Sequence, residues 1–220
     1  MRLDVKICGL STPEAVEAAI AGGASHVGFI FFPKSPRNVS LETAAELARA
    51  AAGRVQRVAV TVDADDAELD RIVEEVRPNL LQLHGQETPE RVRAVKIRFG
   101  LPVMKAFAIR ALEDLERVAR YRGVADRFLF DAKAPAGSAL PGGNGVPFDW
   151  RLLAALDADV EYMLSGGLDA GNVARALAET RPAGIDISSG VETAPGVKDI
   201  RLISEFLETV KSATAASAAS

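Results

Sequence analysis

Leu164-Ser165-Gly166-Gly167 and Ile185-Asp186-Ile187-Ser188-Ser189-Gly190 decide the fold, because each closes a short apolar run with serine and glycine. Such residues let backbone N–H groups approach an anion closely, and the start of a following helix adds the positive end of its dipole. In a (β/α)8 barrel, the loops after the last two strands hold a phosphate in this way. The two turns therefore predict a fold, a phosphate site at the ends of strands 7 and 8, and a class of substrate.

Short β-rich runs alternate with helical patterns along the whole chain. The predicted strands are 3–8, 26–31, 56–62, 80–83, 102–106, 127–131, 161–165 and 184–188. The predicted helices are 13–21, 41–52, 66–77, 89–99, 112–120, 150–156, 171–179 and 199–211. Several helices have a capping residue before the first turn, as in Thr12-Pro13 and Ser40-Leu41. Eight strand–helix units favour one closed α/β TIM barrel over an open doubly wound sheet, which gives no reason for two such turns.

The composition is that of one globular domain, with 48% hydrophobic and 25% charged residues in a chain of 220. We expect the barrel to span residues 1–211. Residues 212–220 are alanine, serine and threonine only, and this low complexity predicts a disordered tail. The longest irregular segment, 132–147, follows the sixth predicted strand, so we expect it to lie over the barrel mouth.

Charge and cysteine content restrict the partners. The net charge is −4 without a broad basic field, which argues against nucleic acid as a partner. One cysteine excludes an internal disulfide and fits a reducing cytoplasm. The first ten residues have no signal-peptide pattern, and no apolar run approaches the roughly 20 residues of a membrane span. We expect a cytoplasmic monomer or homodimer that binds a small molecule.

Two residues at predicted strand ends are candidates for acid–base chemistry. Cys8 could act as a nucleophile, a base or a ligand, although most single cysteines only fill apolar space. Asp131 ends the apolar run Phe128-Leu129-Phe130, where burial would raise the pKa of its carboxyl as a general acid requires. The alternative for Asp131 is a cap on the loop backbone.

Arg37 and His84 are candidate binding residues at the same end of the barrel. Arg37 follows two prolines that stiffen its loop, and arginine binds carboxylates through two parallel hydrogen bonds. A solvated surface charge is the alternative for Arg37, and a structural hydrogen-bonded ring is the alternative for His84. His26 begins its strand at the opposite end, so we expect a structural role there. Two histidines and one cysteine do not support a metal site.

Side-chain alternation predicts an ion pair inside the barrel. If Cys8 points inward, Lys6 does too, and Asp186 shares the orientation of Ser188. Closure makes the first and eighth strands neighbours, so we expect Lys6 and Asp186 to pair about one layer below the site. A buried lysine needs such a partner. We also expect the field of this pair to help set the pKa of the Cys8 thiol.

These candidates belong to a larger set of motifs that follow one another in a fixed order. The motifs are Lys6-Ile7-Cys8-Gly9-Leu10, Gly28-Phe29-Ile30-Phe31 with Ser35-Pro36-Arg37, Leu81-Gln82-Leu83-His84-Gly85, Asp131, Gly145-Val146-Pro147-Phe148-Asp149-Trp150, Leu164-Ser165-Gly166-Gly167-Leu168 with Asn172-Val173, and Asp186-Ile187-Ser188-Ser189-Gly190-Val191-Glu192 with Gly196-Val197-Lys198-Asp199. From residue 6 to about residue 211, the chain resembles the phosphoribosylanthranilate isomerases of tryptophan biosynthesis. The opening and closing motifs are specific when they occur together.

The resemblance implies a cofactor-free Amadori rearrangement, which is an aldose–ketose isomerisation. The substrate would be N-(5-phosphoribosyl)anthranilate and the product 1-(2-carboxyphenylamino)-1-deoxyribulose 5-phosphate. By this resemblance, Asp131 protonates the ring oxygen as general acid and Cys8 removes the C2 proton as general base. Arg37 would hold the anthranilate carboxylate, with His84 as a further substrate-binding residue. The backbones that would hold the phosphate are those of Gly166, Gly167, Ser188, Ser189 and Gly190.

The chain departs from the family pattern at two places. Asn144 stands where the family usually has threonine in the glycine-rich loop. The third predicted strand ends in Val60-Thr61-Val62-Asp63, where the family usually has a Val-Phe-Val-Asn type of sequence. We expect Asp63 to add a carboxylate at the mouth and Thr61 to remove an aromatic ring, with altered loop contacts and substrate conformation.

Other barrel functions share part of this pattern. A metal-dependent sugar-phosphate epimerase would need more histidine and carboxylate ligands. The histidine-pathway isomerase has two phosphate sites related by internal repetition, and no half-to-half repeat is present in this sequence. The indole synthase of the tryptophan pathway would need catalytic lysine and glutamate at strand ends. A non-catalytic phosphate-binding barrel would keep the turns but needs no acid and base.

Overall fold

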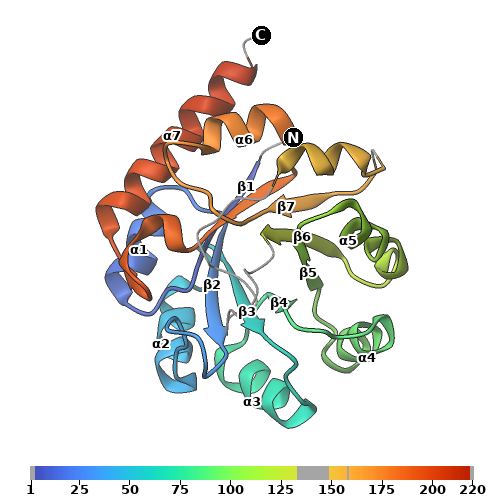
Figure 1. Ribbon diagram of the computed structural model, residues 1–220. Coiled ribbons are helices and arrows are strands. Elements are labelled where there is room, and N and C mark those ends of the chain that lie inside the picture. The colour runs from blue at the N-terminus through green and yellow to red at the C-terminus, as the bar shows by residue number, and fades with distance from the viewer. Residues whose placement is uncertain (1–2, 133–148, 158, 219–220) are drawn as a thin grey trace.

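The computed structural model describes residues 3–132, 149–157 and 159–218, and its centre is a closed parallel barrel with helices around the outside (Figure 1). Each strand pairs with the next along the chain, and β8 returns to pair with β1. The barrel strands are β1 (Asp4–Cys8), β2 (His26–Phe31), β3 (Gln56–Thr61), β4 (Leu80–Leu83), β5 (Val103–Ile109), β6 (Arg127–Ala132), β7 (Tyr162–Leu164) and β8 (Gly184–Ile187). The predicted α/β barrel is confirmed.

The helices follow the predicted order, with differences in the second half of the chain. The α-helices are α1 (Pro13–Ala21), α2 (Leu41–Ala51), α3 (Asp66–Val76), α4 (Pro89–Phe99), α5 (Leu112–Glu116), α6 (Val173–Thr180) and α7 (Ile200–Ala218). The helix predicted at 112–120 is divided into α5 and the 3-10 helix η1 (Val118–Tyr121). The helix predicted at 150–156 is the 3-10 helix η2 (Trp150–Ala155). A two-stranded hairpin, β9 (Glu192–Ala194) with β10 (Val197–Lys198), was not expected from the sequence.

Helices α1 and α2 begin at the capping residues that the sequence predicts. Thr12 accepts a hydrogen bond from the backbone N–H of Ala15, and Pro13 occupies the first turn of α1. Ser40 accepts one from the backbone N–H of Thr43 at the start of α2. These side chains satisfy N–H groups that have no partner within the helix.

The side chains of the barrel strands form two layers, one inside the barrel and one between the strands and the surrounding helices. Side chains that point outward, such as Ile7, Phe29 and Phe130, are completely buried beneath the surrounding helices. A smaller apolar cluster fills the interior of the barrel, namely Cys8, Val58, Val60, Leu80, Met104, Ala106, Leu129 and Met163. The alternation of strand residues between the two layers places the side chains at strand ends toward the barrel mouth.

The interior also holds the ion pair that side-chain alternation predicts. Lys6 and Asp186 are register partners on β1 and β8, and the Lys6 ammonium lies 2.8 Å from the Asp186 carboxylate. Gly28 of β2 makes room for this arrangement. A Cβ at Gly28 would lie 3.0 Å from the sulfur of Cys8 and 3.1 Å from Cε of Lys6. The predicted pairing of Lys6 with Asp186 is confirmed.

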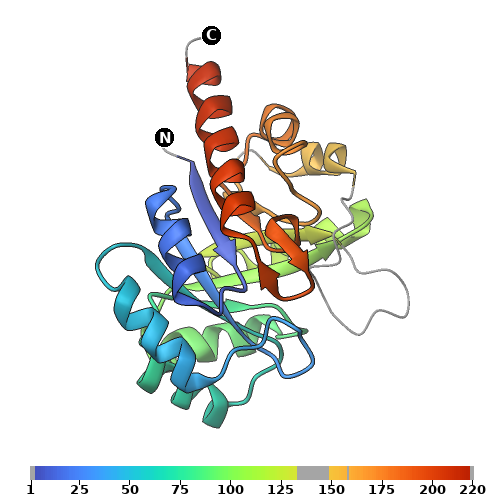
Figure 2. The ribbon, with the colours of Figure 1, turned by 90° about the vertical axis from the view of Figure 1, so that its left-hand side faces the viewer.

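The C-terminal helix runs further than the sequence analysis indicated. α7 packs against α1 along the outside of the barrel (Figure 2) and continues to Ala218, whereas the composition predicts disorder from Ser212. Alanine has the highest helix propensity, which explains why the helix extends through this alanine-rich segment. The predicted loop at 132–147 and Asn144 lie outside the described residues, except that Ala132 ends β6. In the part of the chain that the structure describes, no helix is both long and apolar enough to cross a membrane.

Candidate active site

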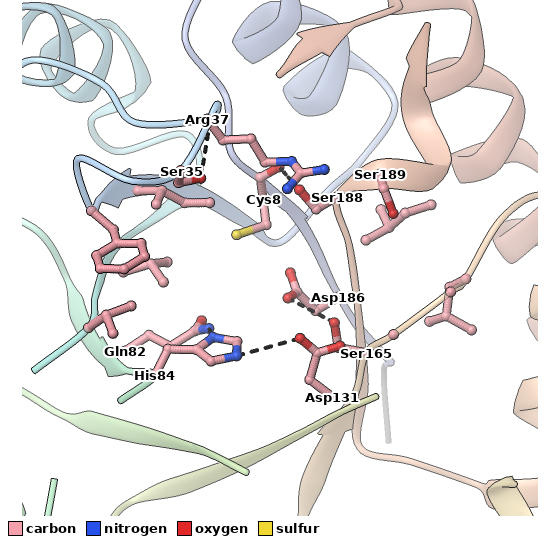
Figure 3. A pocket seen from close by; sticks show the side chains of 18 residues that line it. Cys8, Ser35, Arg37, Gln82, His84, Asp131, Ser165, Asp186, Ser188 and Ser189 are labelled. Atoms are coloured by element: carbon pink, nitrogen blue, oxygen red, sulfur yellow. Dashed lines mark hydrogen bonds and ion pairs between the residues drawn. The ribbon is translucent and has the colours of Figure 1, made fainter. Parts of the chain in front are cut away.

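A pocket opens at the C-terminal ends of the barrel strands, where the sequence predicted the site (Figure 3). Of the predicted site residues, the pocket is lined by Cys8, Arg37, His84, Asp131, Gly166, Gly167, Ser188 and Ser189. Gly190 lies behind the lining, where a Cβ would come within 2.0 Å of the carbonyl oxygen of Leu168. The fold therefore brings the predicted acid, base and turn residues to one cavity.

Cys8 ends β1 with its sulfur directed into the pocket (Figure 3). Its side chain is buried, and burial raises the pKa of the thiol above its ordinary value. The positive charges of Lys6 and Lys198 oppose that rise, because they favour the thiolate. Burial therefore favours the thiol form of Cys8, whereas the two ammonium groups favour its thiolate.

Asp131 projects from β6 into the same pocket, and only 3% of the residue is exposed. One carboxylate oxygen accepts a hydrogen bond from the backbone N–H of Ala132 at 2.8 Å. The other lies 3.5 Å from Nε2 of His84. Gly166 permits this arrangement, since a Cβ there would come within 2.9 Å of an Asp131 oxygen and 2.4 Å of the Ala132 nitrogen.

His84 and Gln82 stand together on the β4 side of the pocket. The amide nitrogen of Gln82 lies 3.1 Å from Nδ1 of His84. When Gln82 donates this hydrogen bond, the proton of the neutral ring is on Nε2, which faces Asp131. Among the described residues, Nε2 of His84 and Oε1 of Gln82 are buried without a hydrogen-bond partner. Buried polar atoms rarely remain unpaired, so these two atoms suit a polar ligand.

The two turns rich in glycine and serine border the pocket, and each has its own backbone geometry. Gly166 and Gly167 both have positive φ, +91° and +65°, which side chains other than glycine rarely adopt. The side-chain amide of Asn172 donates to the carbonyl oxygen of Gly167 at 2.8 Å and fixes the first turn. The second turn leads from Ser188 into the short 3-10 helix η3 (Ser189–Val191). Both turns face the pocket beside Cys8 and Asp131.

Arg37 is buried rather than a solvated surface charge, with 6% of the residue exposed. Its Nε and Nη2 each donate to a different carboxylate oxygen of Glu192 at 2.8 Å. Lys198 in turn lies 2.7 Å from Oε1 of Glu192. Sequence reasoning gave no role to Glu192 or Lys198, although both belong to the closing motif, because nothing local shows that charges in this loop are buried.

Three further residues clarify the sequence predictions. Thr61 is completely buried and absent from the pocket lining, which contains its neighbours Val60 and Val62 instead. Asp63 also lies outside the lining and accepts a hydrogen bond from the backbone N–H of Gln86. Asp63 thus contacts the loop after β4, whereas the expected effect of these two residues on the substrate conformation stays a prediction. His26 is buried, with Nδ1 2.8 Å from the Ser25 hydroxyl, as a structural role requires.

Comparisons with known proteins agree with the geometry. The sequence model of the N-(5'-phosphoribosyl)anthranilate (PRA) isomerase family matches residues 5–209. The curated N-(5'-phosphoribosyl)anthranilate isomerase of Brucella canis is 67% identical over 215 residues, covering 98% of this chain and 97% of the relative. The crystal structure of phosphoribosyl anthranilate isomerase from Thermotoga maritima is 36% identical with a TM-score of 0.86, covering 96% of this chain and 100% of that one.

A second solved phosphoribosyl anthranilate isomerase was determined in complex with reduced 1-(o-carboxyphenylamino)-1-deoxyribulose 5-phosphate. It has 33% identity to this chain and a TM-score of 0.84, with coverage of 96% of this chain and 100% of that one. The residues that the family model matches include the C-terminal end of every barrel strand, from Cys8 to Ile187. On these findings, the chain belongs to the N-(5'-phosphoribosyl)anthranilate isomerase family.

Proposed function

We propose that this chain converts N-(5-phosphoribosyl)anthranilate to 1-(2-carboxyphenylamino)-1-deoxyribulose 5-phosphate, with Asp131 as general acid and Cys8 as general base. The observation that carries the assignment is the placement of these two side chains. They come from different strands, β6 and β1, and reach one pocket. An acid and a base so placed can act on neighbouring atoms of one sugar.

The first step is opening of the furanose ring. Asp131 gives a proton to the ring oxygen while the lone pair of the substrate nitrogen forms an iminium with C1. His84 supports this step, because its Nε2 faces the Asp131 carboxyl at 3.5 Å and can donate a hydrogen bond to the carboxylate that remains.

The second step is removal of the C2 proton by the thiolate of Cys8, which becomes a thiol. The iminium nitrogen accepts the electron pair, and the enolamine that forms tautomerises to the ketone. Because the iminium is an electron sink, a modest base is sufficient. Burial raises the pKa of the Cys8 thiol, and the charges of Lys6 and Lys198 oppose that rise and so favour the thiolate that acts as the base.

The remaining site residues bind the two charged ends of the substrate, its phosphate and its carboxylate. The backbone N–H groups of the Gly166–Gly167 and Ser188–Gly190 turns bind the phosphate, whereas Arg37 binds the anthranilate carboxylate. The chain needs no metal or cofactor for this chemistry, because the substrate carries its own electron sink. We place the enzyme in the cytoplasm, where the thiol of Cys8 stays reduced. It acts on a small molecule, without nucleic acid, as a monomer or a homodimer.

The proposal is tested by following the fluorescence of freshly generated phosphoribosylanthranilate. The parent protein should consume it rapidly, and Cys8→Ser and Asp131→Asn should each lower kcat by several orders of magnitude. Thermal unfolding shows whether the variants are folded. Glu46→Gln, on the exposed side of α2, is the matched control and should retain activity. Binding of substrate by the parent without turnover would overturn the proposal.

A further inference from the structure

Three charged side chains form a buried triad beside the pocket, with Glu192 between Arg37 and Lys198. The Glu192 carboxylate accepts hydrogen bonds from Nε and Nη2 of Arg37 at 2.8 Å each and lies 2.7 Å from the Lys198 ammonium. The exposed fractions of the Arg37, Glu192 and Lys198 side chains are 6%, 4% and 2%. Burial of this kind makes a charge-assisted hydrogen bond stronger and its loss more costly.

The hairpin of β9 and β10 holds two members of the triad against the loop of the third. Gly196, at the hairpin turn, approaches Pro36 so closely that a Cβ would lie 2.4 Å from the Pro36 carbonyl oxygen. On the other side, the Arg37 side chain passes over Gly9, where a Cβ would come within 2.9 Å of its Cδ. The Arg37 guanidinium is therefore fixed next to the residue that follows Cys8.

Lys198 joins the triad to the second turn and to the β1 end. Its ammonium donates to the carbonyl oxygen of Ser188 at 2.8 Å and to the Ser188 hydroxyl at 3.1 Å. The Ser188 hydroxyl donates to the carbonyl oxygen of Cys8 at 3.1 Å. Glu192 thus stands at the centre of a continuous polar network from Arg37 to Cys8.

The net charge of the triad favours the binding of an anion. Two cations and one carboxylate sum to one positive charge, inside a site where water is largely excluded. Burial opposes ionisation of Glu192, but hydrogen bonds from Arg37 and the charge of Lys198 keep the pKa of its carboxyl below the ordinary value. Glu192 is consequently ionised at neutral pH and holds the guanidinium plane of Arg37 in one orientation.

We infer that Glu192, anchored by Lys198, is a positioning residue that orients Arg37 toward the carboxylate of the substrate's aromatic ring. In this way Glu192 determines the preference of the enzyme for an N-aryl group with an ortho carboxylate. The inference rests on the proposed function, since it names how the same site recognises one end of that substrate.

The test compares two substrates in the parent and in Glu192→Gln, namely phosphoribosylanthranilate and the same compound with aniline in place of anthranilate. Glutamine has nearly the same shape but loses the charge, and its amide N–H₂ meets a donor of Arg37 where a carboxylate oxygen stood. We expect kcat/KM for the anthranilate compound to fall about 10–100-fold, mainly through KM. For the aniline compound, kcat/KM should change by less than about 2-fold.

A second variant separates positioning from support of the fold. In an Arg37→Met background, Glu192→Gln should cause no further loss on the anthranilate compound, because the group that it orients is absent. If Glu192→Gln does not fold, Glu192→Asp keeps the charge with a shorter reach, and its loss should again be confined to the anthranilate compound.

Two outcomes would overturn the inference: equal losses on both substrates, or an additional loss in the Arg37→Met background. Failure of the proposed function has a different result, because the parent protein would then turn over neither compound.

Discussion

Lys6 is completely buried, and it serves two partners at once. Its ammonium lies 2.8 Å from the Asp186 carboxylate, and its charge favours the thiolate of Cys8. The pKa of Lys6 itself is raised, because the attraction of Asp186 and Cys8 exceeds the effect of burial. A lysine that stays charged in the barrel interior is therefore a fixed source of positive potential below the thiol of Cys8, the base that we propose.

Replacing Lys6 with methionine should move the alkylation profile of Cys8 to higher pH, because a positive charge that lowers the thiol pKa is lost. The chain has a single cysteine, so iodoacetamide reports on Cys8 alone. Leaving Asp186 without its partner should also lower the free energy of unfolding by about 3–5 kcal/mol. Lys211→Met, an exposed position on α7, is the control. An unchanged profile in folded Lys6→Met would contradict the role assigned to Lys6.

Because of His26, the free energy of unfolding should fall as the pH is lowered from 6.5 towards 4. Burial lowers the pKa of its ring from 6.5 to about 4, while Asp4 opposes the shift and Arg127 and Lys6 assist it. Between these values the unfolded chain binds a proton that the folded protein does not, so stability falls as pH falls from 6.5 towards 4. Urea unfolding should show a loss of about 2–3 kcal/mol between pH 7 and pH 4.5 that His26→Gln does not show. Equal losses in parent and variant would exclude His26 as the cause.

Individual residues of the site differ in how far the sequence could predict them. Strand alternation and barrel closure are enough to pair Lys6 with Asp186, because both effects are geometric and regular. Their positions at strand ends make Cys8 and Asp131 candidates, whereas only the family resemblance assigns them the roles of base and acid. Glu192 could not be assigned in the same way, since its partner Arg37 lies 155 residues away and no periodic pattern connects two loops.

At the scale of elements, the turn after β7 packs against the end of β6, which carries the proposed acid Asp131. Gly166 combines a φ of +91° with close packing against Ala132 and Asp131. Two constraints therefore favour glycine at position 166: the positive φ of its backbone and the close approach of the end of β6.

Gly166→Ala should lower both stability and activity. The added Cβ would meet the Ala132 nitrogen at 2.4 Å and an Asp131 oxygen at 2.9 Å, so the carboxyl of the acid must move. Gly53→Ala is the matched control, because its φ is +75° but no atom lies within 4 Å of the added Cβ. Both variants should lose about 1–2 kcal/mol for the left-handed backbone, and only Gly166→Ala should lose more and show a lower kcat. Similar kcat values in the two variants would show that the turn does not position Asp131.

The elements themselves were predicted best where periodicity is strong. The strands in the first half of the barrel match their predicted ranges closely, as β2 and β4 illustrate. The regions predicted at 112–120 and 150–156 instead contain short or 3-10 helices, because tight turns replace the regular α-helical path there. The hairpin of β9 and β10 escaped prediction, since two strands of three and two residues are too short to show alternation.

At the scale of the whole molecule, only the first half of α7 packs against the barrel as part of the outer layer of helices. Phe206, Leu207 and Val210 are almost completely buried against the barrel, whereas none of the described side chains from Lys211 to Ala216 is buried. The barrel proper thus needs the chain as far as residue 211, which is the boundary that we propose for the domain.

A protein that ends after Lys211 should therefore keep the melting temperature and the activity of the full chain to within experimental error. A protein that ends after Glu205 is the contrasting variant, because it loses three buried side chains worth about 1.5–3 kcal/mol each. We expect that shorter protein not to fold. Differential scanning fluorimetry distinguishes the two, and a large loss of melting temperature in the longer variant would move the domain boundary towards residue 218.

The pairing of Lys6 with Asp186 also sets the order of events during synthesis on the ribosome. The two residues are separated by 180 positions, and at 5–20 residues per second the lysine emerges about 10–40 s before its partner exists. Throughout that interval β1 carries a charge that cannot be buried in an apolar interior. The nascent chain can assemble neighbouring strand–helix units, but it cannot seal the cylinder. Closure of the barrel therefore has to wait for a nearly finished polypeptide, because β8, the second neighbour of β1 and the strand that carries Asp186, is synthesised last.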